Sequence, residues 1–445
     1  MPLIGTRGAA SAQGFGFAAL SGPVYYFATL GLSGNDYGAG AVVDTDGNMY
    51  IAGTRDDAGE DFIIAKYNTS GVIQWQRKLG TTGTDRANGI AIDASANVYI
   101  TGISNNNGYA YLAKYNTSGT LQWQKQLQKA SLPIGSNAVA VDTSGNVYIA
   151  GYEYVLLTCC GTNIDVLYAK YNSSGTLQWQ RKISRGGFTP DFGYGVASDS
   201  SGNVHVTGQF DFGPSGYGRN LGWAKFDTSG TLQWGQVSLG SGTDEGRDAS
   251  VDSSGNMYIV GYGSSGATGG TDDLVVYKLN SSGVGQWQRR LGDNTPQIGT
   301  AVGLDSANNV YVGGGTSLDS TSKILLAKYN TSGTIQWQRT ITCTGSPCQI
   351  RGLSVSSDGT IYFSGFVGTS PEQTIFSGKL PGDGSKTGTY TVGALSFTYA
   401  ASSLTDASIT TNLGGSFSTE ALSLTDATPS LTSSTSTLTA TTKTL

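Results

Sequence analysis

The feature that most constrains the fold of this chain is a tandem repeat of about fifty residues. The repeat has two segments, typified by Asp142-Thr-Ser-Gly-Asn-Val-Tyr-Ile-Ala-Gly151 and Ala169-Lys-Tyr-Asn-Ser-Ser-Gly-Thr-Leu-Gln-Trp-Gln-Arg181. A period of this length indicates an architecture in which each unit buries its apolar face against its neighbours. Seven copies of the first segment begin at Asp44, Asp93, Asp142, Asp199, Asp252, Asp305 and, degenerately, Ser356.

Each repeat contains four short β-branched or aromatic runs. They are separated by Asp-x-x-Gly-Asn and Asn-Thr-Ser-Gly, whose residues favour turns. In the second repeat the expected strands are residues 89–92, 98–102, 110–115 and 121–127, with no helical period between them. A four-stranded meander cannot bury both of its faces alone, whereas radial packing of several copies can bury them. We therefore predict an all-β fold: a seven-bladed β-propeller of four-stranded antiparallel blades.

The start of the chain indicates how the ring closes. Residues 24–31 have the pattern of the outermost strand of a blade, yet they precede the first complete copy of the repeat. We expect this strand to complete the seventh blade, although residues 389–399 also fit that place. The predicted propeller thus spans residues 24–400, after an N-terminal arm at residues 1–23.

Residues 401–445 form a tail of different composition, rich in Ser, Thr and Leu. Leu424, Leu431, Leu438 and Leu445 are seven residues apart. Leucines at this spacing alternate between the faces of a flat strand, so a heptad-like stalk or an intertwined β-fibre fits better. Ser and Thr are weak helix formers, which keeps an unstructured linker as an alternative. We expect a non-propeller tail that acts as a stalk or assembly segment.

The alternation of D-x-x-G-N-V-Y-[IV]-x-G with A-K-Y-N-x-S-G-x-x-Q-W is similar to the SBBP family of propeller repeats, over about residues 24–400. This resemblance implies the seven-bladed fold and little about activity, because propellers host many functions. The second segment also resembles the tryptophan-docking motif of quinoprotein propellers: Ala65, Gly71 and Trp75 match, but Tyr67 replaces an acid. The implied blade-docking residues are Trp75, Trp123, Trp179, Trp234, Trp287 and Trp337.

The loops after the second strand are longer in three repeats. They span residues 152–164, 209–220 and 262–272, and loops at this place all lie on one face of a propeller. Their Tyr, Ser, Gly and Asn content suits recognition, although loops also accept insertions at little cost. The candidate binding residues on this face are Tyr152, Tyr154, Phe210, Phe212, Tyr217 and Tyr262.

Residues that suggest catalysis or metal binding have simpler structural interpretations. His205, the single histidine, stands where other repeats have tyrosine. The segment from Asp44 to Asn48 begins like a calcium loop, but Arg55 occupies the place of the bidentate Glu. No Gly-x-Ser-x-Gly elbow suggests a hydrolase. We expect no enzyme, no catalytic residue, no cofactor and no bound metal; a quinoprotein-like, cofactor-dependent enzyme is an alternative.

The four cysteines form two pairs. Cys159 and Cys160 are adjacent in the longest insertion, and a vicinal disulfide accompanies the cofactor in some quinoprotein dehydrogenases. The missing acid in the docking motif and seven blades rather than eight favour a structural role. Cys343 and Cys348 flank a four-residue turn, which permits a small disulfide in an oxidising medium.

Composition narrows the class of partner. Only 13% of the residues are charged, the net charge is -5, and no Lys/Arg block suits nucleic acid. No apolar run approaches the roughly twenty residues that span a bilayer, and the first residues lack the apolar stretch of an export signal. We therefore expect a soluble protein without nucleic-acid binding or membrane insertion.

The Gly-rich start and the Ser/Thr/Leu tail resemble the ends of structural proteins of marine tailed phages. This resemblance implies a virion protein of a tail, fibre or decoration. Its propeller would contact a host-surface glycan or protein or other virion proteins, as a homo-oligomer or within a larger assembly. A secreted or cell-surface bacterial binding protein of the SBBP type is the alternative.

Overall fold

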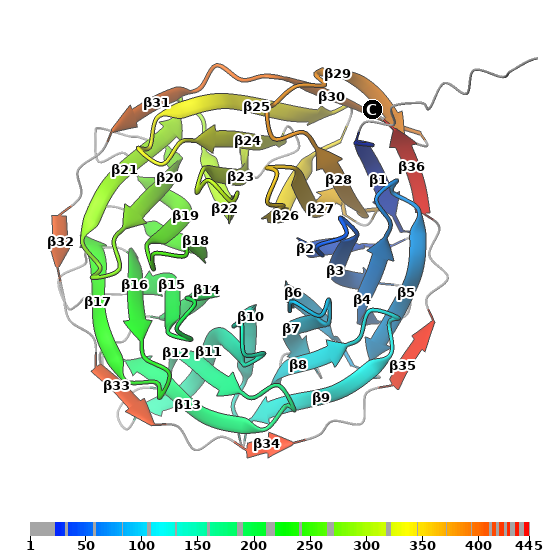
Figure 1. Ribbon diagram of the computed structural model, residues 1–445. Helices are drawn as coiled ribbons and strands as arrows, with labels where there is room; N and C mark the ends of the chain where they lie inside the picture. The colour runs from blue at the N-terminus through cyan, green and yellow to red at the C-terminus, as the bar shows by residue number, and fades with distance from the viewer. Residues whose placement is uncertain are drawn as a thin grey trace, which may run out of the picture.

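Seven β-sheets form a ring around a central axis, seen end-on in Figure 1. This computed structural model describes residues 23–408 with short interruptions, and five strands between residues 412 and 444. The undescribed residues are 1–22, 32–33, 57–58, 82, 105–107, 130, 158–160, 185–189, 211–218, 240–242, 265–270, 317–321, 345, 371, 393, 409–411, 415–417, 422–424, 428–431, 436–439 and 445. Each blade has four antiparallel core strands, which confirms the predicted seven-bladed propeller.

Blades one to three follow one another along the chain, each from its innermost to its outermost strand. Blade one consists of β2 (Tyr37–Val43), β3 (Met49–Asp56), β4 (Glu60–Tyr67) and β5 (Ile73–Gly80). Blade two consists of β6 (Arg86–Ile92), β7 (Val98–Ser104), β8 (Tyr109–Tyr115) and β9 (Leu121–Gln128). Blade three consists of β10 (Ile134–Val141), β11 (Val147–Leu157), β12 (Gly161–Tyr171) and β13 (Leu177–Ser184).

Blades four to six continue in the same order. Blade four consists of β14 (Phe192–Ser198), β15 (Val204–Phe210), β16 (Asn220–Phe226) and β17 (Leu232–Leu239). Blade five consists of β18 (Asp244–Val251), β19 (Met257–Ser264), β20 (Asp272–Leu279) and β21 (Gly285–Gly292). Blade six consists of β22 (Gln297–Leu304), β23 (Val310–Thr316), β24 (Lys323–Tyr329) and β25 (Ile335–Cys343).

The repeated aspartate builds the turn between the first two strands of a blade. In blade three Asp142 Oδ1 accepts the backbone N–H groups of Ser144 and Asn146. Its Oδ2 accepts hydrogen bonds from the Asn146 amide and the Tyr148 hydroxyl. Gly145 has a φ of +78°, a conformation that glycine adopts at low cost. The same aspartate bonds recur in blades one, two, five and six, so the motif is a turn.

The tryptophan of each repeat joins its blade to the next. Its indole N–H donates to a carbonyl in the turn that follows the third strand of the next blade. In the seventh blade Tyr26 takes the position of the tryptophan. It pairs with Lys379 as Trp179 pairs with Lys170 in blade three. The six bonds run from Trp75 to Thr117 at 2.9 Å, Trp123 to Ser173 at 3.2 Å, Trp179 to Thr228 at 3.0 Å, Trp234 to Ser281 at 3.2 Å, Trp287 to Thr331 at 3.0 Å and Trp337 to Gly382 at 3.0 Å.

A glycine in each of these turns makes room for the indole, and Gly119 tests its role. Gly119 has a φ of +72°, and a Cβ there would lie 2.7 Å from Trp75. We expect Gly119→Ala to lower the free energy of unfolding by about 2–4 kcal/mol, through backbone strain and displacement of the ring.

Gly47→Ala is the matched control. Gly47 has a φ of +81°, but its added Cβ would approach Thr69 only to 3.4 Å. This variant should show the backbone strain alone, about 1–2 kcal/mol. Thermal unfolding of both variants measures the difference, and equal losses would contradict a docking role for the indole.

The ring closes through a strand from the start of the chain. Blade seven consists of β26 (Cys348–Val355), β27 (Ile361–Val367), β28 (Thr374–Leu380) and β1 (Tyr26–Leu30). All five residues of β1 are buried. Residues 389–399, the other segment that fits this place, lie instead in the hairpin of β29 (Gly388–Val392) and β30 (Leu395–Ala401), which pairs with β25 in blade six.

The C-terminal tail runs around the outside of the ring as a belt of short strands, coloured orange to red in Figure 1. The sequence predicts a stalk, a fibre or a linker, whereas these strands pair antiparallel with the outermost strands of blades five, four, three, two, one and seven in turn. These strands begin six to eight residues apart. The seven-residue spacing of the leucines therefore matches the length of tail that runs from one blade to the next. The belt consists of β31 (Thr405–Ser408), β32 (Asn412–Gly414), β33 (Ser418–Ala421), β34 (Thr425–Ala427), β35 (Thr432–Thr435) and β36 (Ala440–Thr444).

No helix that could span a bilayer occurs among the described residues.

Candidate functional site at the mouth of the central channel

Every innermost strand contains a β-bulge at the same register. In blade two the pairing shifts between Ala87 and Gly89, so Asn88 has no partner on β7. A bulge re-aims the extra side chain and is common beside functional sites. The seven bulged residues form a ring around the axis, here called the bulge ring: Ala39, Asn88, Asn137, Tyr194, Arg247, Thr300 and Arg351.

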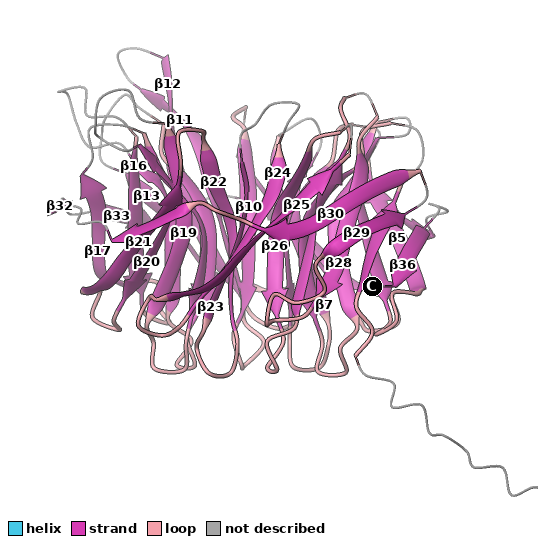
Figure 2. Cartoon of the chain, turned by 90° about the horizontal axis from the view of Figure 1, so that it is seen from above, coloured by secondary structure: helices cyan, strands magenta, loops and turns pink. Residues whose placement is uncertain are grey.

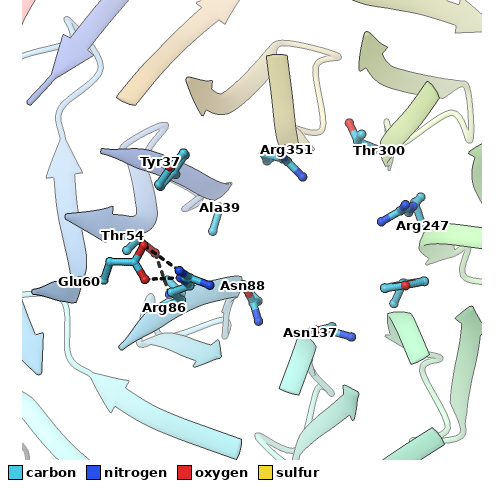
Figure 3. A pocket seen from close by; sticks show the side chains of 13 residues that line it. Tyr37, Ala39, Thr54, Glu60, Arg86, Asn88, Asn137, Arg247, Thr300 and Arg351 are labelled. Atoms are coloured by element: carbon cyan, nitrogen blue, oxygen red, sulfur yellow. Dashed lines mark hydrogen bonds and ion pairs between the residues drawn. The ribbon is translucent and has the colours of Figure 1, made fainter. Parts of the chain in front are cut away.

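The bulge ring lines a cavity at one mouth of the channel. The cavity has a volume of about 570 Å³, and Tyr37, Thr54, Glu60 and Arg86 also line it (Figure 3). Thr54 lies near the end of β3 and Glu60 at the start of β4, so both lie beside the loop that joins these two strands. The cavity therefore opens on the face that carries the loops after the second strand. Figure 2 shows the hairpin of β11 and β12 standing out from the ring on this face.

Arg247 is held rigidly in the ring by an ion pair and two aromatic side chains. Its Nη2 lies 2.6 Å from Oε2 of Glu245. Its guanidinium lies over the ring of Tyr194 at 4.6 Å and over that of Tyr262 at 5.4 Å. Such contacts fix the orientation of the guanidinium. Arg247 thus presents a pre-positioned cation to the cavity.

Arg351 is a second cation and has no acidic partner among the described residues. Its guanidinium lies 5.6 Å from the ring centre of Phe366. Enclosure by the channel walls and the neighbouring Arg247 both lower the pKa of Arg351. Arg86, at the rim, differs because it forms an ion pair with Glu60, with Nη2 2.9 Å from Oε1. The positive charge that is not neutralised therefore lies at Arg351.

The opposite side of the ring presents amide oxygens. Asn88 Nδ2 donates to the carbonyl of Ser136 at 2.9 Å, and Asn137 Nδ2 donates to that of Gly193 at 2.9 Å. Both acceptors belong to the innermost strand of the next blade, so each amide has a fixed orientation. Within the described residues, Oδ1 of both asparagines accepts no hydrogen bond. The cavity thus combines guanidinium donors on one side with carbonyl acceptors on the other (Figure 3).

A family comparison identifies the repeat. Residues 74–110 match the β-propeller repeat SBBP. The chain is a β-propeller in which this segment, from blades one and two, is similar to the SBBP repeat. No curated protein matches the chain.

Solved structures with a similar arrangement have low sequence identity to the chain. The polysaccharide lyase Uly1 is 10% identical, with 77% of this chain and 90% of that chain covered and a TM-score of 0.46. YCF48 bound to D1 peptide is 12% identical, with 81% and 96% covered and a TM-score of 0.43. At these identities the likeness says nothing about the activity of this chain.

Asp248, directly after the bulge in blade five, differs from the residue at the same place in the other blades. Its Oδ2 accepts the N–H of Val302 from blade six at 2.9 Å, and its Oδ1 accepts the N–H of Ala249 at 2.8 Å. Burial nevertheless raises the pKa of Asp248 to about 7. The other six blades have a small residue here, namely Gly40, Gly89, Ala138, Gly195, Ala301 and Gly352.

Asp248 should therefore make stability depend on pH. The folded state binds the proton more tightly than the unfolded state, so this stabilisation is complete at about pH 4 and is lost as the pH rises through about 7. Asp248→Ala should gain up to about 4 kcal/mol relative to the native chain between pH 4 and pH 8. Urea unfolding at both pH values measures this gain, and parallel stability curves would exclude it.

The candidate residues of the long loops lie in different environments. Phe210 is buried in the core, where a Cβ on Gly222 would contact its ring. Tyr262 is 7% exposed and packs on Arg247. Tyr152 and Tyr154 are half-buried on β11, whose hairpin with β12 replaces the expected loop. Phe212 and Tyr217 lie outside the described residues.

Other residues considered for chemistry lie in structural contacts. His205 is buried on β15, with Nε2 3.4 Å from Asp199 Oδ2, the place of the tyrosine hydroxyl in other blades. Cys343 and Cys348 form a disulfide that joins β25 to β26. Cys159 and Cys160 lie outside the described residues. The described part of the chain holds no group of His, Cys, Asp or Glu side chains arranged to bind a metal.

The bulge ring was not predicted from the sequence, although the repeat contains a signal for it. Its members stand five residues before the turn aspartate of each repeat, or before Ser356 in blade seven. At this position the repeats differ in size and charge, from Ala39 to Arg247, between neighbours that are small or apolar except for Asp248. A position that varies in this way in the innermost strand of every repeat marks a side chain that leaves the core.

Proposed function

We propose that this chain is a recognition module that binds its ligand in the bulge ring and serves in adhesion or attachment. The observation that carries the proposal is the ring itself: seven side chains of different chemistry are aimed into one cavity by the same backbone device. Ligand sites of this size, with a few polar groups on a rigid frame, are typical of small-molecule and glycan-sized ligands. The longer loops on the same face would add contacts around the mouth.

Several contacts favour binding over catalysis. The carboxylates of Glu60 and Glu245 are engaged by arginines, and the amides of Asn88 and Asn137 are anchored to the next blade. Groups held in this way offer fixed hydrogen-bonding partners rather than proton transfer. Pre-organisation of this kind increases affinity, since the site loses little freedom when the ligand binds.

We further propose a virion as the setting, with the propeller as a tail, fibre or decoration component. The low surface charge and the Gly-rich and Ser/Thr-rich ends support this setting. The partners would be other virion proteins and a host-surface glycan or protein. Immunogold electron microscopy of particles released from the source cells should locate the chain on the particle. Its recovery only as free protein would contradict the virion setting and favour a secreted or cell-surface bacterial protein.

A glycan array tests the recognition function directly. The full-length chain should bind a subset of glycans, and the double variant Arg247→Gln/Arg351→Gln should lose that binding. Because Arg247→Gln also removes the arginine nearest to the buried Glu245, thermal unfolding shows whether the variant is still folded at the temperature of the assay. Lys125→Gln, which removes one charge from the outer strand β9, is the control and should bind as the native chain does. Binding that survives the double variant would show that the bulge ring is not the site.

A further inference from the structure

The charge of the cavity indicates the class of ligand, if the recognition function proposed above holds. Arg86 is neutralised by Glu60, and Arg247 by Glu245. Arg351 is left without an acidic partner among the described residues and is exposed to the channel. A guanidinium without a counter-charge favours an anion, which it binds through charge-assisted hydrogen bonds. The ligand should therefore carry a negative group that reaches Arg351.

The geometry of the donors favours a carboxylate. A guanidinium binds a carboxylate through two parallel hydrogen bonds. A phosphate or sulfate would fit the same fork, but the acceptors that line the rest of the cavity oppose further negative charge. These acceptors are the free Oδ1 atoms of Asn88 and Asn137. One negative charge on one side of the ligand suits this distribution.

The acceptors also indicate what the rest of the ligand carries. Oδ1 of Asn88 and Asn137 can only accept hydrogen bonds, so the ligand must supply the donors. Hydroxyl groups are the commonest such donors on small ligands. The rings of Tyr37 and Tyr194 add apolar surface to the lining. A cavity of about 570 Å³ lies in the range of sites for small ligands. A hydroxylated ring with one carboxylate has all of these features.

We infer that the bulge ring binds an acidic sugar, with its carboxylate on Arg351 and Arg247 and its hydroxyl groups on Asn88 and Asn137. The basic members come from blades five and seven and the amides from blades two and three. The ligand therefore lies across the axis and contacts both sides of the ring. Thr300, between the two arginines, donates to the carbonyl of Ile350 at 2.9 Å and fixes the spacing of blades six and seven.

Binding of D-glucuronate, followed by saturation-transfer NMR on the full-length chain, tests this inference. D-glucuronate should bind, whereas D-glucose and the methyl ester of glucuronate should bind at least tenfold more weakly because they lack the charge. Acetate should also bind at least tenfold more weakly because it lacks the hydroxyl groups. Inorganic phosphate should compete poorly. Tight phosphate binding, or equal binding of glucose and glucuronate, would overturn the inference.

Variants at two positions separate the two sides of the ligand. Arg351→Gln should weaken glucuronate binding at least tenfold. Arg351→Lys should weaken it less, since lysine keeps the positive charge but lacks the two parallel N–H donors of the guanidinium. Asn137→Asp should weaken binding by repulsion, and thermal unfolding of each variant shows whether the fold is intact. If neutral glycans bind and Arg351→Gln has no effect on them, recognition stands and the acidic sugar is wrong. If neither acidic nor neutral sugars bind, both proposals fail.

Discussion

Deleting residues 402–445 should leave a ring that still folds but melts at a lower temperature and associates through its outer edges. The belt covers the outermost strand of six blades with three to five residue pairs each. At about 1 kcal/mol for each backbone hydrogen bond, its loss costs on the order of 5 kcal/mol or more. The uncovered edges then present free N–H and C=O groups, which template pairing with other chains. Light scattering and thermal unfolding measure both effects.

Two controls distinguish edge protection from a general loss of solubility. The first control is a tail of the same composition in scrambled order, which keeps the polar residues but loses the spacing that places one short strand on each blade. A synthetic peptide of residues 402–445, added to the truncated chain, should restore the original size and melting temperature. If truncation changes neither property, or if the scrambled tail works equally well, the belt does not stabilise the ring.

The blades were predictable from the sequence because local turn chemistry defines them. Asp142 and Gly145 determine a turn within a few residues, and the strands expected at 98–102 and 110–115 are observed as Val98–Ser104 and Tyr109–Tyr115. Closure by residues 24–31 was predictable for the same reason, since an orphan outer strand has only one vacant place in a ring of seven.

The belt and the bulge ring were not predicted, since both depend on the sheet rather than on the local sequence. A period of seven residues was interpreted as a heptad or fibre, but the six short strands from β31 onward show that it measures the distance between blade edges. The strand expected from the sequence began at residue 89, directly after Asn88, because the bulge between Ala87 and Gly89 arises from how β6 pairs with β7. Local sequence patterns identify strands, whereas the pairing of the strands decides which residues are bulged and point into the channel.

Phe27→Ala should destabilise the closed ring more than any other single truncation in β1. Phe27 is fully buried, and its ring centre lies 5.5 to 6.2 Å from those of four other aromatic rings, belonging to Phe363, Phe376, Tyr390 and Phe397. Truncation of a buried phenylalanine to alanine costs about 3–5 kcal/mol. Because β1 belongs to blade seven by pairing but not by chain continuity, the cost should also release this strand. Thermal unfolding and hydrogen exchange of β1 measure the two effects.

Phe363→Ala is the matched control, because it removes the same side chain from the same aromatic cluster. Phe363 lies on β27, whose neighbours along the chain belong to the same blade. Both variants should lose a similar free energy of unfolding, but only Phe27→Ala should accelerate exchange in β1 well before global unfolding. Equal exchange of β1 in the two variants would mean that pairing with β28 and β36 holds the closing strand without its aromatic anchor.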